Sequence, residues 1–556
     1  MNHNIIKGFT ALTAAAALLS GCNLDLTPTD RVAEQVMWES TTNAEKAVNS
    51  IHSYIYDVYA NQSVIGLTES LTDVMKYGSY NYNALAFIPS EFAYGESTTI
   101  KATYVDAYMG YWESRYEDIR RTNEAISNLH KYGKMNDQDK TRLEAELRFI
   151  RAYLYFDLVK RYKDIIIYDE DLNAMTKDRA LSSEAEAWDF IQTDLQYAAD
   201  NLPTKDQASY RLDKGIAYAF MSRAMLYAER YDAVIEAANQ VEALGYDLEE
   251  NYADSYSKSI ANGNKEAILQ YYFNRDGGVT HSFDYYYTPG GDFSLNGATG
   301  GGYGTPTQEL VESYEKATGG KPNWEPFHKA NVTATPPYAE LEPRFHATVL
   351  YNGSNWKGRT IEPFVGGDDG FCTWNIEPEP KGRTTTGYYL RKGVDETHNV
   401  IQYSSGVQPL TIIRYAEVLL NKAEALYFKG DEGAAEDIIN GKIRHRVGLP
   451  AISADGEALF AAIRQERKVE FAFEGLWYWD LRRWEIAHKS YSEGGLTGYQ
   501  VHGFKIAKNE ATGEFTYSYI SVDDKDRNFS DKLYRFPLPS SELSNNGAVA
   551  QFPEWL

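Results

Sequence analysis

The strongest constraint on the fold is a helical spacing of apolar residues that recurs along much of the chain. In residues 144–162, the side chains of Leu147, Ile150, Leu154 and Leu158 follow one another at intervals of three and four. Because an α-helix turns once in about 3.6 residues, this spacing aligns them on one stripe of a helix. The same periodicity predicts further helices at residues 42–60, 103–131, 182–200, 214–243, 413–446 and 459–484.

Two of the predicted helical hairpins resemble each other. Residues 224–227 read Ala-Met-Leu-Tyr and residues 425–427 read Ala-Leu-Tyr, and each run leads through a short turn into a second helix with further alanines. Small residues let paired helices approach closely and a large residue fills the groove, which is the packing of tetratricopeptide repeats. The pattern therefore favours stacked helix pairs, and two unrelated hairpins are the alternative.

Between the helical segments the periodicity and the composition of the sequence change. Residues 61–100 and 271–412 lose the helical periodicity, and glycines and prolines separate clusters of aromatic residues. Such stretches are typical of binding loops that rigid elements hold in place. We therefore expect a single domain over residues 41–556 in which these two stretches form a loop-rich binding half. The helical scaffold is expected over residues 41–60, 101–270 and 413–486, followed by an irregular region of hairpin and coil over residues 487–556.

The N-terminus has the pattern of an export signal. Lys7 supplies the positive end, residues 8–19 form a short apolar run, and Leu-Ser-Gly-Cys at residues 19–22 resembles a bacterial lipobox. The pattern predicts a lipoprotein signal peptide over residues 1–21 and a lipidated Cys22. Residues 22–40 then form a polar tether, and two or more acyl chains would anchor it stably in a membrane. Apart from Cys22 the chain has only Cys372, so a lipidated Cys22 leaves no disulfide partner within the chain.

Charge and aromatic content narrow the class of ligand. The net charge of -24 argues against a nucleic-acid partner, because binding to phosphates needs clustered Lys and Arg. The chain has 44 Tyr and 10 Trp, and the apolar face of a sugar ring stacks on such side chains while its hydroxyls need polar partners. The candidate ligand-binding residues in the loop-rich stretches are Asp73, Tyr80, Tyr82, Tyr94, Tyr285, Tyr303, Trp324, Trp356, Trp374 and Arg391. Further candidates beside them are Asn81, Asn83, Tyr286, Tyr287 and Arg383.

The sequence offers few of the motifs that would indicate an enzyme. The sequence contains no His-Glu-x-x-His, no Gly-x-Ser-x-Gly and no phosphate-binding Gly-x-x-x-x-Gly-Lys-Ser/Thr. The glycine run at residues 300–302 lacks the following Lys and the preceding strand of a phosphate loop, so it is interpreted as a flexible turn. Glu466, Glu470 and Glu474 lie one helical turn apart, and with nearby arginines they predict a semi-buried network that fixes helix packing.

No catalytic residue, cofactor or metal ligand is therefore assigned from the sequence. An α-helical glycoside hydrolase is the main alternative, because such enzymes need only two carboxylates at the right separation. A purely structural partner of a membrane transporter is a third hypothesis.

Several segments, in order along the chain, together resemble one known family, the SusD/RagB-like nutrient-binding outer-membrane lipoproteins. They include Glu-Leu-Arg-Phe-Ile-Arg-Ala-Tyr at residues 146–153, Pro-Thr-Gln-Glu-Leu-Val at 306–311, Arg-Tyr-Ala-Glu-Val-Leu-Leu at 414–420, Asp-Leu-Arg-Arg-Trp at 480–484 and Phe-Pro-Leu-Pro at 536–539. The resemblance implies an all-α fold, with four tetratricopeptide-type helix pairs cradling an irregular, loop-rich half that carries the ligand site.

The resemblance also implies a function. A protein of this family sits at the cell surface on the outer membrane, binds oligosaccharide or polysaccharide without cleaving it, and delivers it to a SusC-like TonB-dependent transporter. Some relatives bind peptides instead, so a peptide ligand of the same fold is an alternative. The family's ligand residues vary with the glycan, and no motif transfers them to positions of this chain.

Overall fold

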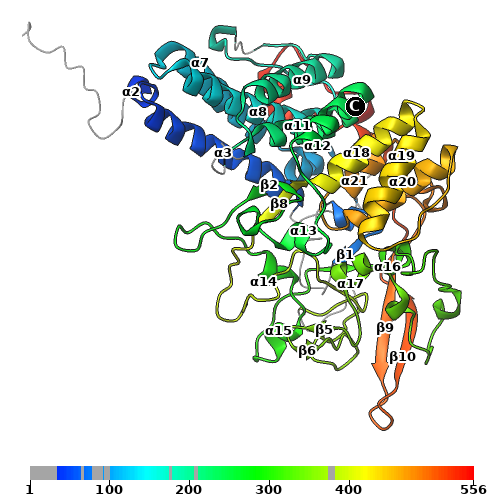
Figure 1. Ribbon diagram of the computed structural model, residues 1–556. Helices are drawn as coiled ribbons and strands as arrows, with labels where there is room; N and C mark the ends of the chain where they lie inside the picture. Colours follow the sequence, from blue (N-terminus) through cyan, green and yellow to red (C-terminus); the bar gives the residue numbers. More distant parts are fainter. Residues whose placement is uncertain are drawn as a thin grey trace, which may run out of the picture.

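The computed structural model describes residues 34–63, 68–77, 92, 100–174, 178–205, 211–373 and 382–556. Figure 1 shows two halves: helices from both ends of the chain pack together, and the middle of the chain forms a loop-rich half beside them. The predicted helical fold with an irregular half is therefore confirmed. No helix of the described residues is both long and apolar enough to cross a membrane.

The helical half contains most of the longer helices. These are α3 (Thr41–Ser63), α7 (Trp112–Tyr132), α8 (Asp137–Tyr162), α9 (Glu184–Asn201), α11 (Lys214–Tyr227), α12 (Tyr231–Ala243), α18 (Tyr415–Phe428), α19 (Glu432–Ile438), α20 (Gly456–Glu470) and α21 (Trp477–Arg483). The shorter helices are α2 (Glu34–Trp38), α6 (Ala102–Val105), α13 (Asp254–Ser257), α14 (Phe283–Tyr287), α15 (Gly291–Ser294), α16 (Gln308–Ser313), α17 (Pro343–Thr348) and α22 (Ser540–Asn545).

The strands of the described residues form small antiparallel pairs and no large sheet. The pairs are β1 (Met75–Tyr77) with β3 (Gly304–Pro306), β2 (Ala267–Tyr271) with β8 (Leu410–Arg414), β4 (Val349–Leu350) with β7 (Tyr389–Leu390), β5 (Asn355–Trp356) with β6 (Arg359–Thr360), and β9 (His502–Lys508) with β10 (Phe515–Ser521). The β9–β10 hairpin projects from the loop-rich half in Figure 1, and it lies in the region expected to contain a hairpin.

Helix α8 is the central helix of the scaffold, and it is buried on nearly all sides. The side chain of Asn136 caps its start by accepting a hydrogen bond from the backbone N–H of Asp139. Several of its charged residues are also buried, because they pair with neighbouring helices: Arg151 Nε donates to Asp194 of α9 at 2.7 Å, and Asp157 accepts from Arg115 of α7 at 2.9 Å. Ion pairs as well as apolar packing therefore fix α8 among its neighbours.

The two hairpins with similar sequences are α11–α12 and α18–α19, and they stack on each other. The ring of Tyr231 in α12 lies against that of Phe428 in α18, with centroids 4.9 Å apart and planes 15° apart. Gly430 ends α18 with a positive φ of 81°, a conformation that glycine adopts without steric cost. The predicted stacking of helix pairs is confirmed at this contact.

Apart from the two hairpins, two of the predicted helices are broken in the structure. Residues 103–131 are interrupted at Tyr111, which has a positive φ of 58° and separates the π-helical turn Asp106–Gly110 from α7. Residues 459–484 form α20 and α21, separated by a turn in which Phe473 has a positive φ of 65°. Glu474 lies in this turn and not on α20, so the prediction that it continues the stripe of Glu466 and Glu470 was wrong. Its carboxylate still joins the network, because it accepts hydrogen bonds from Lys392 and Arg414 at 2.6 and 2.7 Å.

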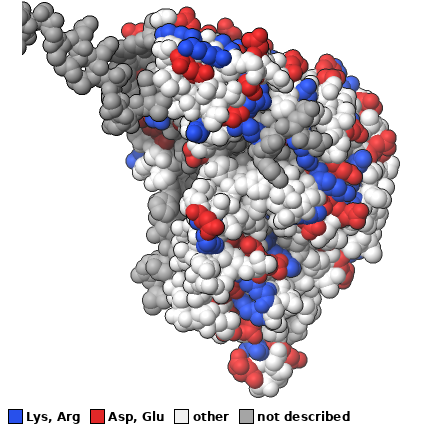
Figure 2. Space-filling model, turned by 60° about the vertical axis from the view of Figure 1, so that its left-hand side comes forward, with Lys and Arg blue, Asp and Glu red and all other residues white. Residues whose placement is uncertain are grey.

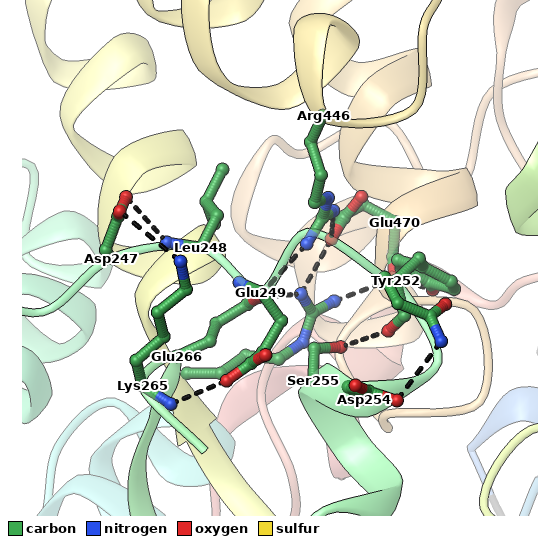
Figure 3. A network of polar contacts seen from close by, with 12 residues as sticks. Asp247, Leu248, Glu249, Tyr252, Asp254, Ser255, Lys265, Glu266, Arg446 and Glu470 are labelled. Atoms are coloured by element: carbon green, nitrogen blue, oxygen red, sulfur yellow. Dashed lines mark hydrogen bonds and ion pairs between the residues drawn. The ribbon is translucent and has the colours of Figure 1, made fainter. Parts of the chain in front are cut away.

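A buried ion-pair network joins the two halves. Glu470, at the end of α20, has no solvent exposure and accepts hydrogen bonds from Arg414 at 2.6 Å, from Arg344 at 3.2 Å and from Arg446. Arg446 also donates to Glu266 at 3.1 Å, and Figure 3 shows it reaching both carboxylates. Burial alone would raise the pKa of Glu470, but the three guanidinium groups outweigh it and lower the pKa.

Replacing one carboxylate of this network should destabilise the whole fold. Glu470→Gln removes a buried carboxylate that three arginines share, and their remaining partners, such as Glu266 and Glu466, do not replace its charge. We therefore expect the free energy of unfolding to fall by about 3–5 kcal/mol. Because the pKa of Glu470 is lowered from 4.5, its stabilisation is present at neutral pH and is lost as the pH falls below about 4.5. Denaturant titration at pH 7 and at lower pH measures both effects.

The matched control for this variant is Glu510→Gln, which changes an exposed glutamate in the turn between β9 and β10. The control should unfold at the same denaturant concentration as the parent protein. Equal stability of Glu470→Gln and the control at pH 7 would contradict the role given to the network.

Candidate functional site

Three tyrosines form a partly exposed aromatic surface on the loop-rich half, called here the tyrosine surface: Tyr285, Tyr286 and Tyr303. The rings of Tyr286 and Tyr303 lie 4.5 Å apart between centroids, and Tyr285 meets Tyr286 edge-on at 5.6 Å. The ring of Phe293 packs edge-on against that of Tyr285, with centroids 5.1 Å apart, and Phe293 is itself buried. Adjacent aromatic rings that are partly exposed to solvent suit stacking against the apolar face of a sugar ring.

Local structure fixes these rings in place. Helix α14 is a single turn, which directs Tyr287 into the core against Phe283 and leaves Tyr285 and Tyr286 at its partly exposed side. The backbone N–H of Tyr303 donates to the carbonyl of Tyr286 at 2.9 Å, so the residue just before β3 is bonded directly to α14. The tyrosine surface is therefore preorganised by backbone hydrogen bonds.

The glycine run at residues 300–302 makes this approach possible. All three glycines are buried, and a Cβ at Gly301 would lie 2.2 Å from the carbonyl oxygen of Thr288. A Cβ at Gly382 would lie 1.9 Å from the carbonyl oxygen of Gly300. The interpretation of the run as a flexible turn was wrong, because here glycine permits close contact between backbones in a packed crossing.

A polar network behind the tyrosine surface holds the loops together. Asp292 of α15 accepts hydrogen bonds from Trp356 Nε1 at 3.1 Å, from Lys357 at 3.0 Å and from Arg359 at 2.9 Å. Arg359 also donates to both carboxylate oxygens of Asp369 at 2.8 Å. Because these charged groups form hydrogen bonds with one another, their role is to hold the loops together.

Two of the aromatic residues that were predicted to bind the ligand are buried in this structure. Trp356 has no exposed surface and Trp324 is 5% exposed, so neither ring offers a face to a ligand in this conformation. Trp324 packs against Phe327 and Tyr338, and Trp356 lies over the network of Asp292. Both rings fill the core of the loop-rich half, because a large apolar ring gains most free energy when it leaves water.

Two of the polar residues that were predicted to bind the ligand are hydrogen-bonded to other groups of the protein. Asp73 is buried and accepts hydrogen bonds from Lys468, Trp477 and Tyr491 at 2.6, 3.1 and 3.0 Å, which ties the segment before β1 to the helical half. Arg383 donates to the carbonyl oxygen of Gly367 at 3.2 Å.

Arg391 lies away from the tyrosines. It pairs with Glu396 at 2.7 Å and lines a separate cavity of about 740 Å³. None of the three tyrosines lines that cavity, so the structure does not bring Arg391 to the tyrosine surface.

Some predicted positions lie outside the described residues. These are Cys22, Tyr80, Asn81, Tyr82, Asn83, Tyr94 and Trp374. Of the candidates that are described, Tyr285 and Tyr303 come together. Tyr286 completes the surface, and the sequence could not separate it from Tyr287 because three consecutive tyrosines carry no periodicity.

Charged side chains are spread unevenly over the face shown in Figure 2. Lys, Arg, Asp and Glu side chains gather over the helical part, and a broad area below is formed mostly by other residues. A neutral ligand with hydroxyl groups is compatible with such a surface.

Comparison with known proteins identifies relatives over nearly the whole chain. A model of the SusD family matches residues 265–555, and a model described as starch-binding associating with outer membrane matches residues 24–226. A SusD-like protein of Bacteroides ovatus is 23% identical over 508 residues, covering 85% of this chain and 81% of that protein.

Solved structures of SusD-like proteins are also similar to this chain over most of its length. A SusD-like protein of Bacteroides fragilis is similar with a TM-score of 0.76 and 28% identity, covering 95% of this chain and 99% of that one. A SusD-like carbohydrate binding protein of the same organism is similar with a TM-score of 0.73 and 22% identity, covering 92% and 100%.

The segment that leads into β1 should make stability depend on pH. Glu69, in the short helix η1 (Glu69–Leu71), is buried, and its Oε1 accepts a hydrogen bond from the backbone N–H of Gly475 at 2.8 Å. Burial raises its pKa from 4.5 to about 8, so the folded protein keeps this carboxyl protonated where the unfolded chain has lost the proton. The contribution of Glu69 to stability is therefore present below pH 4.5 and is lost as the pH rises to about 8.

Glu69→Gln should remove this dependence, because the amide keeps the acceptor oxygen and does not ionise. We expect the variant to gain stability relative to the parent protein as the pH rises from 4.5 to 8. Thermal unfolding across this range measures the difference, with Glu510→Gln as the exposed control. A difference that stays constant with pH would refute the assignment.

Proposed function

The chain belongs to the SusD family, and from this premise we propose that it is a cell-surface glycan-binding lipoprotein. In this proposal the tyrosine surface captures oligosaccharide, and the protein passes it to a SusC-like TonB-dependent transporter in the outer membrane. The protein leaves the glycosidic bonds intact.

The observation that carries the proposal is the geometry of Tyr285, Tyr286 and Tyr303. Three partly exposed rings in contact, braced by buried backbone crossings, form a preorganised surface that loses little conformational entropy on binding. The family model described as starch-binding associating with outer membrane supports a carbohydrate as the ligand.

Binding without cleavage is supported by Asp292, the carboxylate at the centre of the network that braces the loops. A glycosidase needs a general acid whose pKa is raised. Burial works to raise the pKa of Asp292, but Lys357, together with hydrogen bonds from Thr288 and Arg359, lowers it. A carboxylate held ionised by two cations is poorly suited to donate a proton to a leaving group.

Removal of one ring should weaken glycan binding. An aromatic contact contributes about 0.5–1.5 kcal/mol, so Tyr303→Ala is expected to weaken the affinity about two- to tenfold. Tyr303→Phe should bind nearly as well as the parent protein, because it retains the ring face. Affinity gels containing starch, mannan, fructan or xylan, followed by calorimetry with the retained glycan, measure the effect.

The matched control for the ring variants is Tyr403→Ala, which removes a tyrosine of similar size that is 45% exposed on a different loop. Full retention of glycan by Tyr303→Ala, or equal losses in Tyr303→Ala and Tyr403→Ala, would contradict the proposed site. Release of new reducing ends from the retained glycan would show an enzyme instead.

The proposed anchor depends on Cys22. Cys22→Ser removes the thiol to which lipid would be attached, so the protein should leave the membrane fraction and lose its labelling by radioactive palmitate. Cys372→Ser is the matched control, since it changes the other cysteine of the chain and should leave attachment unaffected. Membrane attachment that persists in Cys22→Ser would count against a lipid anchor at this position.

A further inference from the structure

Residues 399–405, called here the strap, form a mostly exposed loop whose two ends are fixed to the rest of the loop-rich half. At one end, Lys357 Nζ donates to the backbone carbonyl oxygen of His398 at 2.8 Å. At the other end, the backbones of His281 and Gly406 exchange two hydrogen bonds, at 3.1 and 2.7 Å. The contacts between these two ends therefore decide whether the middle of the strap stays in place.

The side chain of His398 connects the middle of the strap to α14. Its Nε2 lies 3.0 Å from the carbonyl oxygen of Tyr403, and its Nδ1 lies 2.8 Å from Oδ2 of Asp284, a buried residue of α14. A backbone carbonyl oxygen and a carboxylate oxygen both accept hydrogen bonds, so each ring nitrogen donates and carries a proton. A histidine with two N–H groups is an imidazolium, and His398 is therefore a cation in the closed strap.

His281 is as buried as His398 and shows the opposite arrangement. Each of the two residues is 8% exposed. Nδ1 of His281 accepts a hydrogen bond from the backbone N–H of Phe283 at 3.2 Å, and its Nε2 donates to the carbonyl oxygen of Gln408 at 3.1 Å, so its ring is neutral. Burial lowers the pKa of His281, whereas the hydrogen bond to Asp284 raises the pKa of His398. The partners of each ring, and not its burial, decide its charge.

The charged groups around His398 favour its protonated form. Asp284 of α14 contacts the ring directly, and Asp395 of the same loop adds further negative charge. The ammonium group of Lys357 bonds to the backbone carbonyl of His398, and the nearby His281 is neutral. Because the pKa of His398 is raised from 6.5, its contribution to holding the strap is present below pH 6.5 and is lost as the pH rises through the raised value.

We propose that His398 is a pH-sensitive clasp, which holds the strap against α14 while its ring is charged and releases it when the ring loses a proton. The neutral ring has a single N–H and can no longer donate to both Tyr403 and Asp284. The buried carboxylate of Asp284 then loses its cationic partner, which also destabilises the start of α14. Because α14 carries Tyr285 and Tyr286, the clasp connects the pH of the surroundings to the order of the tyrosine surface.

The release is confined to part of the strap. Arg275 donates to the carbonyl oxygen of Ser405 at 2.8 Å, and Val400 is buried, and neither contact involves the ring of His398. The segment released with the proton is therefore residues 401–404.

The first measurement is the titration of His398 in the full-length protein. Nuclear magnetic resonance of histidine side chains labelled with carbon-13 follows each imidazole, and the resonance that is missing in His398→Gln belongs to His398. This resonance should titrate with a midpoint above pH 6.5. A midpoint at or below pH 6.5 would overturn the proposal.

The second measurement is hydrogen exchange of the backbone amides in residues 401–404, expressed as protection relative to the intrinsic rate at each pH. In the parent protein the protection should fall about tenfold or more between pH 6 and pH 9, because a hydrogen bond from a charged donor is lost. His398→Gln cannot become charged, so its protection should be low at both pH values. His445→Gln replaces an exposed histidine that is distant in sequence, and it should keep the pH dependence of the parent.

Protection of residues 401–404 that is independent of pH in the parent protein, or that changes equally in the parent and in His398→Gln, would contradict the clasp. Amides of α8, in the other half of the molecule, show whether His398→Gln has unfolded as a whole, and in that case the titration of His398 in the parent protein decides. Neither measurement needs a glycan, so the result is independent of the proposed function.

Discussion

The carboxylate of Glu470, buried among Arg344, Arg414 and Arg446, is the contact on which the arrangement of the two halves depends. Arg344 belongs to α17 in the loop-rich half, and Glu470 ends α20 in the helical half. Charges removed from water at this depth are tolerated only when nearly every partner is satisfied. The network therefore favours one relative placement of the halves over others with similar apolar burial.

A fixed placement of the two halves matters because only short helices and strands surround the tyrosine surface within its own half. Helix α14 is one turn long, and its neighbours are strands of two to five residues. The rings of Tyr285, Tyr286 and Tyr303 are held by backbone contacts at the glycine run and by the network of Asp292. Rigid support at a distance allows the exposed faces to be ready before a ligand arrives.

The helices were predictable, and the exposure of aromatic residues was not. Apolar periodicity located α8 and the stacked hairpins because apolar residues spaced by three and four align on a helix, although α8 is buried on nearly all its other sides as well. It could not tell that Trp356 is buried while Tyr303 is partly exposed, since loop residues carry no period and their burial is decided by contacts distant in sequence. The same limit explains Asp73, whose three partners lie about four hundred residues further along the chain.

The central claim is that sugar rings stack on the tyrosine surface without being cleaved. A crystal structure of the protein with an oligosaccharide that affinity gels have selected tests it most directly. The account predicts an intact sugar chain with at least one ring in van der Waals contact, within about 4 Å, of Tyr303 or Tyr286. An oligosaccharide found elsewhere, with none of the three tyrosines in contact, or one found hydrolysed, would contradict it.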